Sequence, residues 1–303
     1  MSDAPEPHLL GTAVGRHSLG RHVVGTRIVV RHLLPDGRAT DVLGVCLAWG
    51  DTELVIDRDG AGPVTIRVSD VVTGKPVPPR ASIAHRFDAH EIELHVGSLW
   101  PAMDSAPLGT WLLRSSPPFG GRLRRRGNSA LAMAEPGLPV ADAASAVRAF
   151  YAALGQDPLI QVQADSAVEA ALVPFGFTPL GAGDAHCQVA LVSRALRSST
   201  ASPSASTQLE EGDDRVRVSL DGGTATGEAV LDGDWLGIHD VAVDPTHRRR
   251  GLATHVLAEL LDWGASQGAR IAWLHVETNN PGAIALYERL GFVTHHTNRY
   301  LSG

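Results

Sequence analysis

Four basic side chains stand together in the stretch DPTHRRRGLATHVL, residues 244–257. They are His247 and Arg248 to Arg250, and they directly precede Gly251 and an apolar pattern of helical period. A helix N-terminus attracts anions because it presents unpaired N–H groups and a partial positive charge. Arginines add charge-assisted hydrogen bonds to phosphate, and a glycine leaves room for a close approach. We therefore predict a phosphate-binding helix start, with a solvated basic loop as the alternative.

The two best-known nucleotide motifs do not fit this stretch, which lacks both the Lys-Ser/Thr ending of a P-loop and a G-x-G-x-x-G pattern. Together with LHVETNNPGAIALYERLGF, it resembles the GNAT family of acetyl-CoA-dependent N-acetyltransferases. The family signature Arg/Gln-x-x-Gly-x-Gly/Ala is matched by Arg248, Gly251 and Ala253. A second family motif is matched by Asn280, Ala283, Leu286, Tyr287, Gly291 and Phe292. The resemblance covers about residues 214–300.

The resemblance implies acetyl-CoA as co-substrate, with its pantetheine arm along a splayed strand and its pyrophosphate on backbone N–H groups at the helix start. It also implies that Asn280 bonds the pantetheine or the helix that carries Tyr287. The expected cofactor-binding residues are Val241, Ala242, Val243, Arg248, Arg249, Arg250, Gly251, Leu252, Ala253, Thr254 and Asn280.

Acetyl transfer to an amine needs a neutral amine, a polarised thioester carbonyl and a proton for the leaving thiolate. We predict Tyr287 as the general acid, with a core aromatic on an amphipathic helix as the alternative. The backbone N–H of Val243 can polarise the carbonyl. The base is predicted to be His275. The alternatives are His239, Asp240, Glu277, or a base that acts through water.

The sequence also predicts a division of the chain into five segments. These are a disordered N-terminus at 1–17, an SH3-like β-barrel with its linker at 18–80, a degenerate GNAT-like half at 81–196, a Ser/Thr-rich linker at 197–212 and a catalytic GNAT half at 213–303. The expected fold class is an α/β (α+β) GNAT fold with a mixed central sheet, preceded by the degenerate copy and the small all-β barrel. The stretch ELHVGSLWP, residues 93–101, is expected to be strand-like.

An internal repeat supports the two halves, because LIQVQADSAVEAALVPFGF resembles AWLHVETNNPGAIALYERLGF. The first copy has no Arg-x-x-Gly-x-Ala, and its Leu172 stands opposite Tyr287. We therefore expect it to pack on the active half and to line the acceptor site. There Arg114, Arg126 and Asn128 are candidates to contact a polar acceptor, and a solvated loop is the alternative for each.

Charge, cysteine spacing and hydrophobicity argue against several classes of function. The 303 residues carry a formal charge of -7, which argues against a general nucleic-acid binder. Cys46 and Cys187 lie far apart and in no metal-type spacing, so reduced thiols and no metal are expected. No secretory signal and no apolar run of ~20 residues is present, so we expect a cytoplasmic protein without a membrane partner. The oligomeric state stays open.

The layout as a whole resembles actinobacterial-type GNAT proteins with an SH3-like N-terminal domain, some of them classed as N-acetylglutamate synthases. That resemblance implies L-glutamate as the small-molecule amine and a role in arginine biosynthesis. Two alternatives stay open. One is acetylation of a protein N-terminus, a lysine or another small amine, and the other is an acetyl-CoA-sensing binding module.

Overall fold

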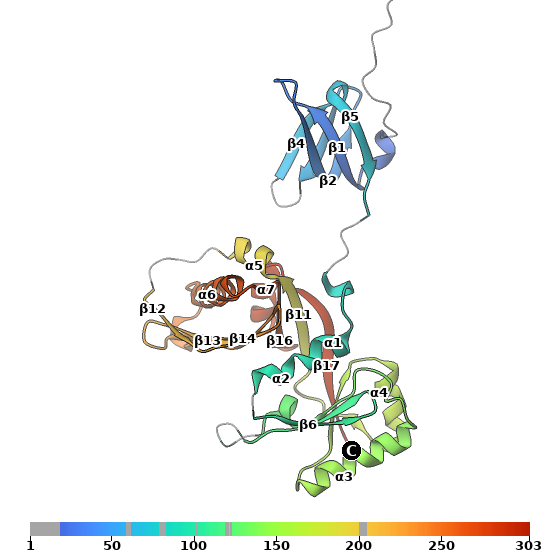
Figure 1. Ribbon diagram of the computed structural model, residues 1–303, viewed down its shortest axis with the longest axis vertical. Coiled ribbons are helices and arrows are strands. Elements are labelled where there is room, and N and C mark those ends of the chain that lie inside the picture. The colour runs from blue at the N-terminus through green and yellow to red at the C-terminus, as the bar shows by residue number, and fades with distance from the viewer. Residues whose placement is uncertain are drawn as a thin grey trace, which may run out of the picture. The chain divides into compact units, whose positions relative to one another are not determined.

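The computed structural model describes residues 19–58, 62–78, 83–100, 102–118, 121, 123–199 and 205–303. The chain divides into two compact units, Met1–Ala81 and Ser82–Gly303 (Figure 1). The predicted disordered segment at 1–17 lies outside the described residues. No described helix is both long enough and apolar enough to cross a bilayer.

The first unit is a five-stranded antiparallel sheet in the order β4-β3-β2-β1-β5. Its strands are β1 (Arg27–Leu33), β2 (Ala39–Trp49), β3 (Glu53–Arg58), β4 (Gly62–Arg67) and β5 (Val71–Pro76), with 3-10 turns at Arg21–Val23 and Val68–Asp70. Alternating side chains such as Ile28, Val30, Leu54 and Ile56 form its core. Among the described residues β4 and β5 are unpaired edges, so the predicted closed SH3-like barrel is not confirmed.

The second unit contains one large mixed sheet in the order β12-β13-β14-β15-β16-β11-β17-β9-β8-β7-β6, with β10 paired to β17. The strands are β6 (Asp104–Leu108), β7 (Trp111–Ser115), β8 (Ala130–Leu131), β9 (Leu159–Gln163), β10 (Thr178–Pro179), β11 (Ala185–Leu191), β12 (Thr207–Glu211), β13 (Arg215–Leu220), β14 (Ala225–Asp232), β15 (Trp235–Val243), β16 (Ile271–Glu277) and β17 (Val293–Ser302). The helices are α1 (Ala89–Leu94), α2 (Val96–Leu99), α3 (Val140–Ala153), α4 (Ala167–Leu172), α5 (Val192–Ser198), α6 (Leu252–Ser266) and α7 (Pro281–Arg289), and short 3-10 turns lie at Ile83–His85, Arg125–Gly127, Val173–Phe175 and Pro245–His247.

The two predicted halves exchange strands. β11 belongs to the first half in sequence but lies between β16 and β17 of the second, and β17 in turn pairs with β9 of the first half. One hydrogen-bonded sheet therefore runs through both halves, which explains why residues 82–303 form a single compact unit. The predicted linker at 197–212 is also shorter than expected, because α5 continues to Ser198 and β12 begins at Thr207.

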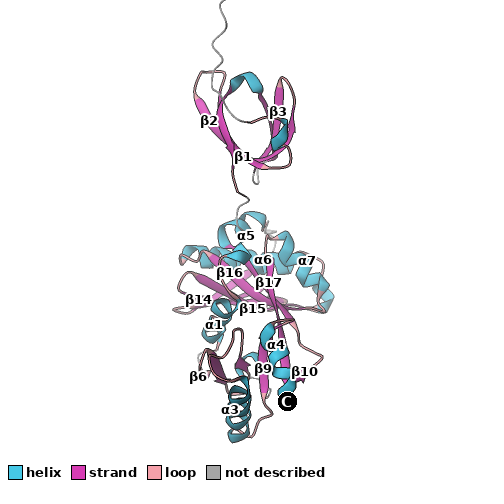
Figure 2. Ribbon diagram, turned by 90° about the vertical axis from the view of Figure 1, so that its right-hand side faces the viewer, coloured by secondary structure: helices cyan, strands magenta, loops and turns pink. Residues whose placement is uncertain are grey.

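The expectation of a strand at residues 93–101 is wrong, because most of this stretch lies in α1 and α2. Asp88 caps α1 by accepting a hydrogen bond from the Glu91 amide at 2.7 Å. Ile92, Val96 and Leu99 then follow helical rather than alternating spacing and pack on Trp235 and Trp273. Figure 2 shows α6 and α7 on one face of the sheet and α1 on the other, so residues early in the unit cover the face opposite α6.

Candidate active site

A groove opens where two parallel strands part. β15 and β16 are paired from Trp235↔Ile271 to Ile238↔Leu274, and β15 then continues beside β14 alone. The cause is a bulge, because Glu228 pairs with His239 while Thr226 pairs with Ala242, so two residues of β15 oppose Gly227. Asp240 in this bulge has φ 51°. Beyond Ile238 the outer edge of β15 therefore has no pairing with β16 in the described sheet.

The loop before α6 forms the second wall of the groove. Asp244 accepts hydrogen bonds from the amide and hydroxyl of Thr246 at 2.8 and 2.5 Å, which starts the Pro245–His247 turn. Arg249 and Gly251 then have φ of 66° and 82°, so the chain turns sharply into α6. The Arg248 guanidinium donates to the Val243 carbonyl at 3.4 Å and ties this loop to the strand end.

The groove has a volume of about 750 Å³ and brings the predicted cofactor residues together. Its lining includes every one of them except Arg250, that is Val241, Ala242, Val243, Arg248, Arg249, Gly251, Leu252, Ala253, Thr254 and Asn280. Among the described lining residues, His247, Arg248, Arg249 and Arg289 are basic and none is acidic. The groove is therefore suited to an extended anionic ligand.

Tyr287 lies in the third wall, on α7. Asn280 caps this helix by accepting a hydrogen bond from the Ala283 amide at 3.1 Å, and Pro281 occupies its first turn. The Tyr287 side chain is buried but lines the groove. Burial raises the pKa of Tyr287 to about 12, so the phenol carries its proton at neutral pH. Sequence analysis missed Gly282 and Arg289 on the same helix, although their helical spacing from Ala283 and Leu286 marks the same face.

His275 does not lie in this groove. Its Nε2 is 2.6 Å from Oε1 of Glu93 on α1, and both side chains are buried. Burial lowers the pKa of His275 to about 4, so the ring is neutral. The predicted base is thus enclosed by a carboxylate that the sequence analysis did not identify, because Glu93 stands 182 residues away along the chain.

The first half holds two of the three predicted acceptor contacts, Arg114 and Asn128, inside its own fold. Arg114 is 1% exposed and donates to the Ser129 carbonyl, the Ser129 hydroxyl and Gln161. The Asn128 side chain is bonded to the amide and hydroxyl of Ser116 and to the Arg124 carbonyl. Both residues shape the loop that carries Arg124 rather than an open surface.

A smaller cavity of about 300 Å³ lies against the opposite face of the β15 bulge. Its lining combines His239 and Asp240 with Trp100 after α2 and Arg124 of the first half. His239 Nδ1 is 3.3 Å from Asp240 Oδ2, and Arg124 contacts the same carboxylate at 3.4 Å. The hydrogen bond from His239, aided by the charges of His239 and Arg124, lowers the pKa of Asp240 to about 2. Two of the alternative bases therefore lie together, beside Glu228.

Residues 211–292, which contain the groove, match the family model described as the acetyltransferase (GNAT) family. The groove therefore lies in the part of the chain that is similar to this family. A 59-residue stretch is 43% identical to the [ribosomal protein bS18]-alanine N-acetyltransferase of Escherichia coli, and the match covers 20% of this chain and 40% of that enzyme.

Two relatives extend over more of the chain. A probable histone acetyltransferase of Mycobacterium tuberculosis is 28% identical over 325 aligned positions, which cover 92% of this chain and 95% of that protein. A solved GCN5-related N-acetyltransferase from Kribbella flavida is 18% identical, with a TM-score of 0.57, and covers 71% of this chain and 95% of that one. At this identity the structural match establishes the fold alone.

Proposed function

We propose that the protein is an acetyl-CoA-dependent N-acetyltransferase that acts at the groove between β15, α6 and α7. The observation that carries this proposal is the meeting of three features: a parted strand pair, a basic helix start and a buried, protonated tyrosine. The pyrophosphate would bind from Arg248 to Thr254, where positive charge and free amides coincide. The pantetheine would run along Val241–Val243, which places the thioester beside Tyr287.

The strand register supports a carbonyl-polarising group. The Asp244 amide donates to the Thr224 carbonyl, and antiparallel pairs alternate between bonded and unbonded. The next pair, Ala225↔Val243, is therefore unbonded, and the Val243 N–H points away from β14 into the opening. In the proposed reaction the amine nitrogen forms a bond to the carbonyl carbon and the C–S bond breaks. Tyr287 gives its proton to the thiolate, and a base takes the proton of the amine.

The acceptor would approach from the opposite face, through the cavity at the bulge. There His239 is held by an ionised Asp240 and is the base that we propose in place of His275. L-Glutamate, which the sequence resemblance implied, needs cations for two carboxylates. In the described structure Arg114 is buried, Arg124 contacts Asp240 and Arg215 contacts Asp214. We therefore propose an amine on a peptide or protein, in line with the substrates that the names of the two acetyltransferase relatives print.

The function is tested by thiol release from acetyl-CoA with purified protein. The panel contains the twenty amino acids, polyamines, and peptides with a free N-terminal or lysine amine. We expect saturable release with peptides. Release with L-glutamate alone would restore the synthase interpretation, and acetyl-CoA binding without any release would leave a sensing module.

The cofactor placement predicts that Arg249→Glu raises the KM for acetyl-CoA roughly tenfold or more, because a charge-assisted bond is replaced by repulsion. Arg270→Glu is the matched control, since it makes the same charge change at an exposed arginine that does not line the groove. Steady-state kinetics with varied acetyl-CoA concentration would measure the KM of each variant and compare them. Equal effects of both substitutions would contradict the placement.

The acid role predicts that Tyr287→Phe lowers kcat by about 100-fold or more, with little change in the KM for acetyl-CoA. Tyr151→Phe is the control, because Tyr151 is also buried, also has its pKa raised to about 12, and lies in the core of the first half. Full turnover in Tyr287→Phe would remove this hydroxyl from the mechanism.

The base role predicts that His239→Gln lowers kcat/KM by about 100-fold and flattens the acid limb of the pH–rate profile. His95→Gln provides a matched control, because His95 Nδ1 also contacts a carboxylate, that of Asp232 at 2.7 Å, away from the cavity. An unchanged acid limb in His239→Gln would assign the base elsewhere.

A further inference from the structure

Three side chains of metal-ligand type stand in a row across three adjacent strands of the second unit. β11 lies between β16 and β17, and Cys187 is directly opposite His275 on one side and His296 on the other. Residues that face each other in this way have Cβ atoms roughly 5 Å apart when they share a face of the sheet. The row is buried, with Cys187 at 0% and His296 at 5% exposure.

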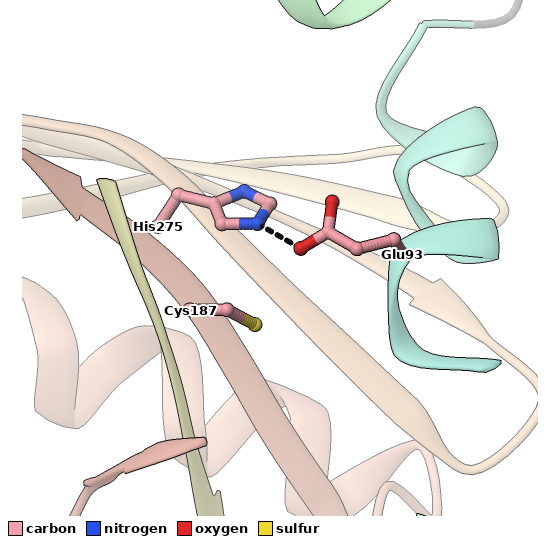
Figure 3. A group of neighbouring side chains, drawn as sticks. All are labelled: Glu93, Cys187 and His275. Carbon is pink, nitrogen blue, oxygen red and sulfur yellow. Dashed lines mark hydrogen bonds and ion pairs between the residues drawn. The ribbon is translucent and has the colours of Figure 1, made fainter. Parts of the chain in front are cut away.

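Glu93 completes the group. Its side chain points from α1 toward the ring of His275 and the sulfur of Cys187, as Figure 3 shows. One carboxylate oxygen, Oε1, is 2.6 Å from His275 Nε2 and 3.0 Å from His296 Nε2. The ligand atoms of Glu93, Cys187 and His275 all lie within 4.8 Å of one another. Donors from four separate elements thus converge on one buried point.

A surrounding shell orients the carboxylate. Asn298 Nδ2 donates to Oε1 at 2.7 Å, and Gln161 Nε2 donates to Oε2 at 2.8 Å. Arg114 in turn donates to Gln161 at 2.8 Å, which fixes the amide orientation. Outer partners of this kind hold first ligands in place at metal sites.

We propose that this cluster binds a zinc ion through Glu93, Cys187 and His275, with His296 as the fourth ligand. Thiolate, imidazole and carboxylate are all zinc donors and a closed set of four ligands is the arrangement of structural zinc sites, whereas hard cations prefer oxygen alone. The carboxylate and the thiolate match the two charges of the ion, so a loaded site adds no net charge to the interior. Binding releases the thiol proton of Cys187, and each coordinating ring keeps its proton on Nδ1.

The ion would join the two halves at their exchanged strands, because its ligands come from α1, β11, β16 and β17. α1 closes over the row, so loading would accompany folding. The site is separate from the acetyl-CoA groove, and its test reads metal rather than activity.

The test is elemental analysis of the full chain expressed with zinc in the medium. It is followed by zinc release into a colorimetric chelator when the protein is unfolded in guanidinium. We expect roughly one zinc per chain, as a closed structural site requires. Cys187→Ser should lose the ion, whereas Cys46→Ser, the matched change at the buried cysteine of the first unit, should keep it. Cobalt loading of the wild-type protein should give a thiolate-to-metal charge-transfer band that is absent from Cys187→Ser.

The cobalt spectrum and the zinc content of the wild-type chain test the proposed zinc site even if a variant fails to fold. Folded wild-type protein with far less than one zinc per chain and no thiolate–cobalt band would overturn the proposal. Zinc that persists undiminished in Cys187→Ser would overturn it as well. The first result would leave a metal-free hydrogen-bonded cluster in which the Glu93 oxygen itself occupies the centre.

Discussion

The bulge of β15 opposite Gly227 is the constraint on which the site depends. A regular β15 would stay paired with β16 along its length, and every backbone group at this point would be satisfied within the sheet. Because pairing with β16 ends at Ile238↔Leu274, the Val243 N–H faces an opening instead of a partner strand. The same bulge turns His239 and Asp240 toward the opposite face. One extra residue in a strand therefore creates both sides of the proposed reaction centre.

The two faces of the opening are built by different parts of the chain. α6 and α7, which follow β15 and β16 directly, enclose the groove with its basic helix start. The opposite face is covered by α1 and α2 and by the loop that carries Arg124, all of which precede residues 211–292 in sequence. The first half lacks the Arg-x-x-Gly-x-Ala pattern, but its residues supply one wall of the cavity at the bulge and the strand β11.

The parts of the site that could be predicted from sequence are those whose residues are near one another along the chain. The helix start from Arg248 to Thr254 and the residues around Asn280 each match a short local motif, so the family resemblance was enough to predict that they share one groove, which they line. The partners of His275 could not be found in this way, because Glu93 and Cys187 reach it only through the order of strands in the sheet. The strand exchange of β11 and β17 was invisible for the same reason. Alternation in residues 93–101 was also misleading, because burial against Trp235 and Trp273 selected the helical period.

Glu93 links these observations physically. Burial by itself would raise the pKa of this carboxyl, but the interactions with His275 and His296, both within hydrogen-bond distance, outweigh burial and hold the pKa well below its ordinary value. An ionised buried carboxylate is tolerated only where several donors surround it, and here they come from β9, β16 and β17. Any shift of β16 relative to β17 would leave that charge without partners at high cost. The cluster therefore holds β16, one of the two strands that flank the opening, in register with β11 and β17.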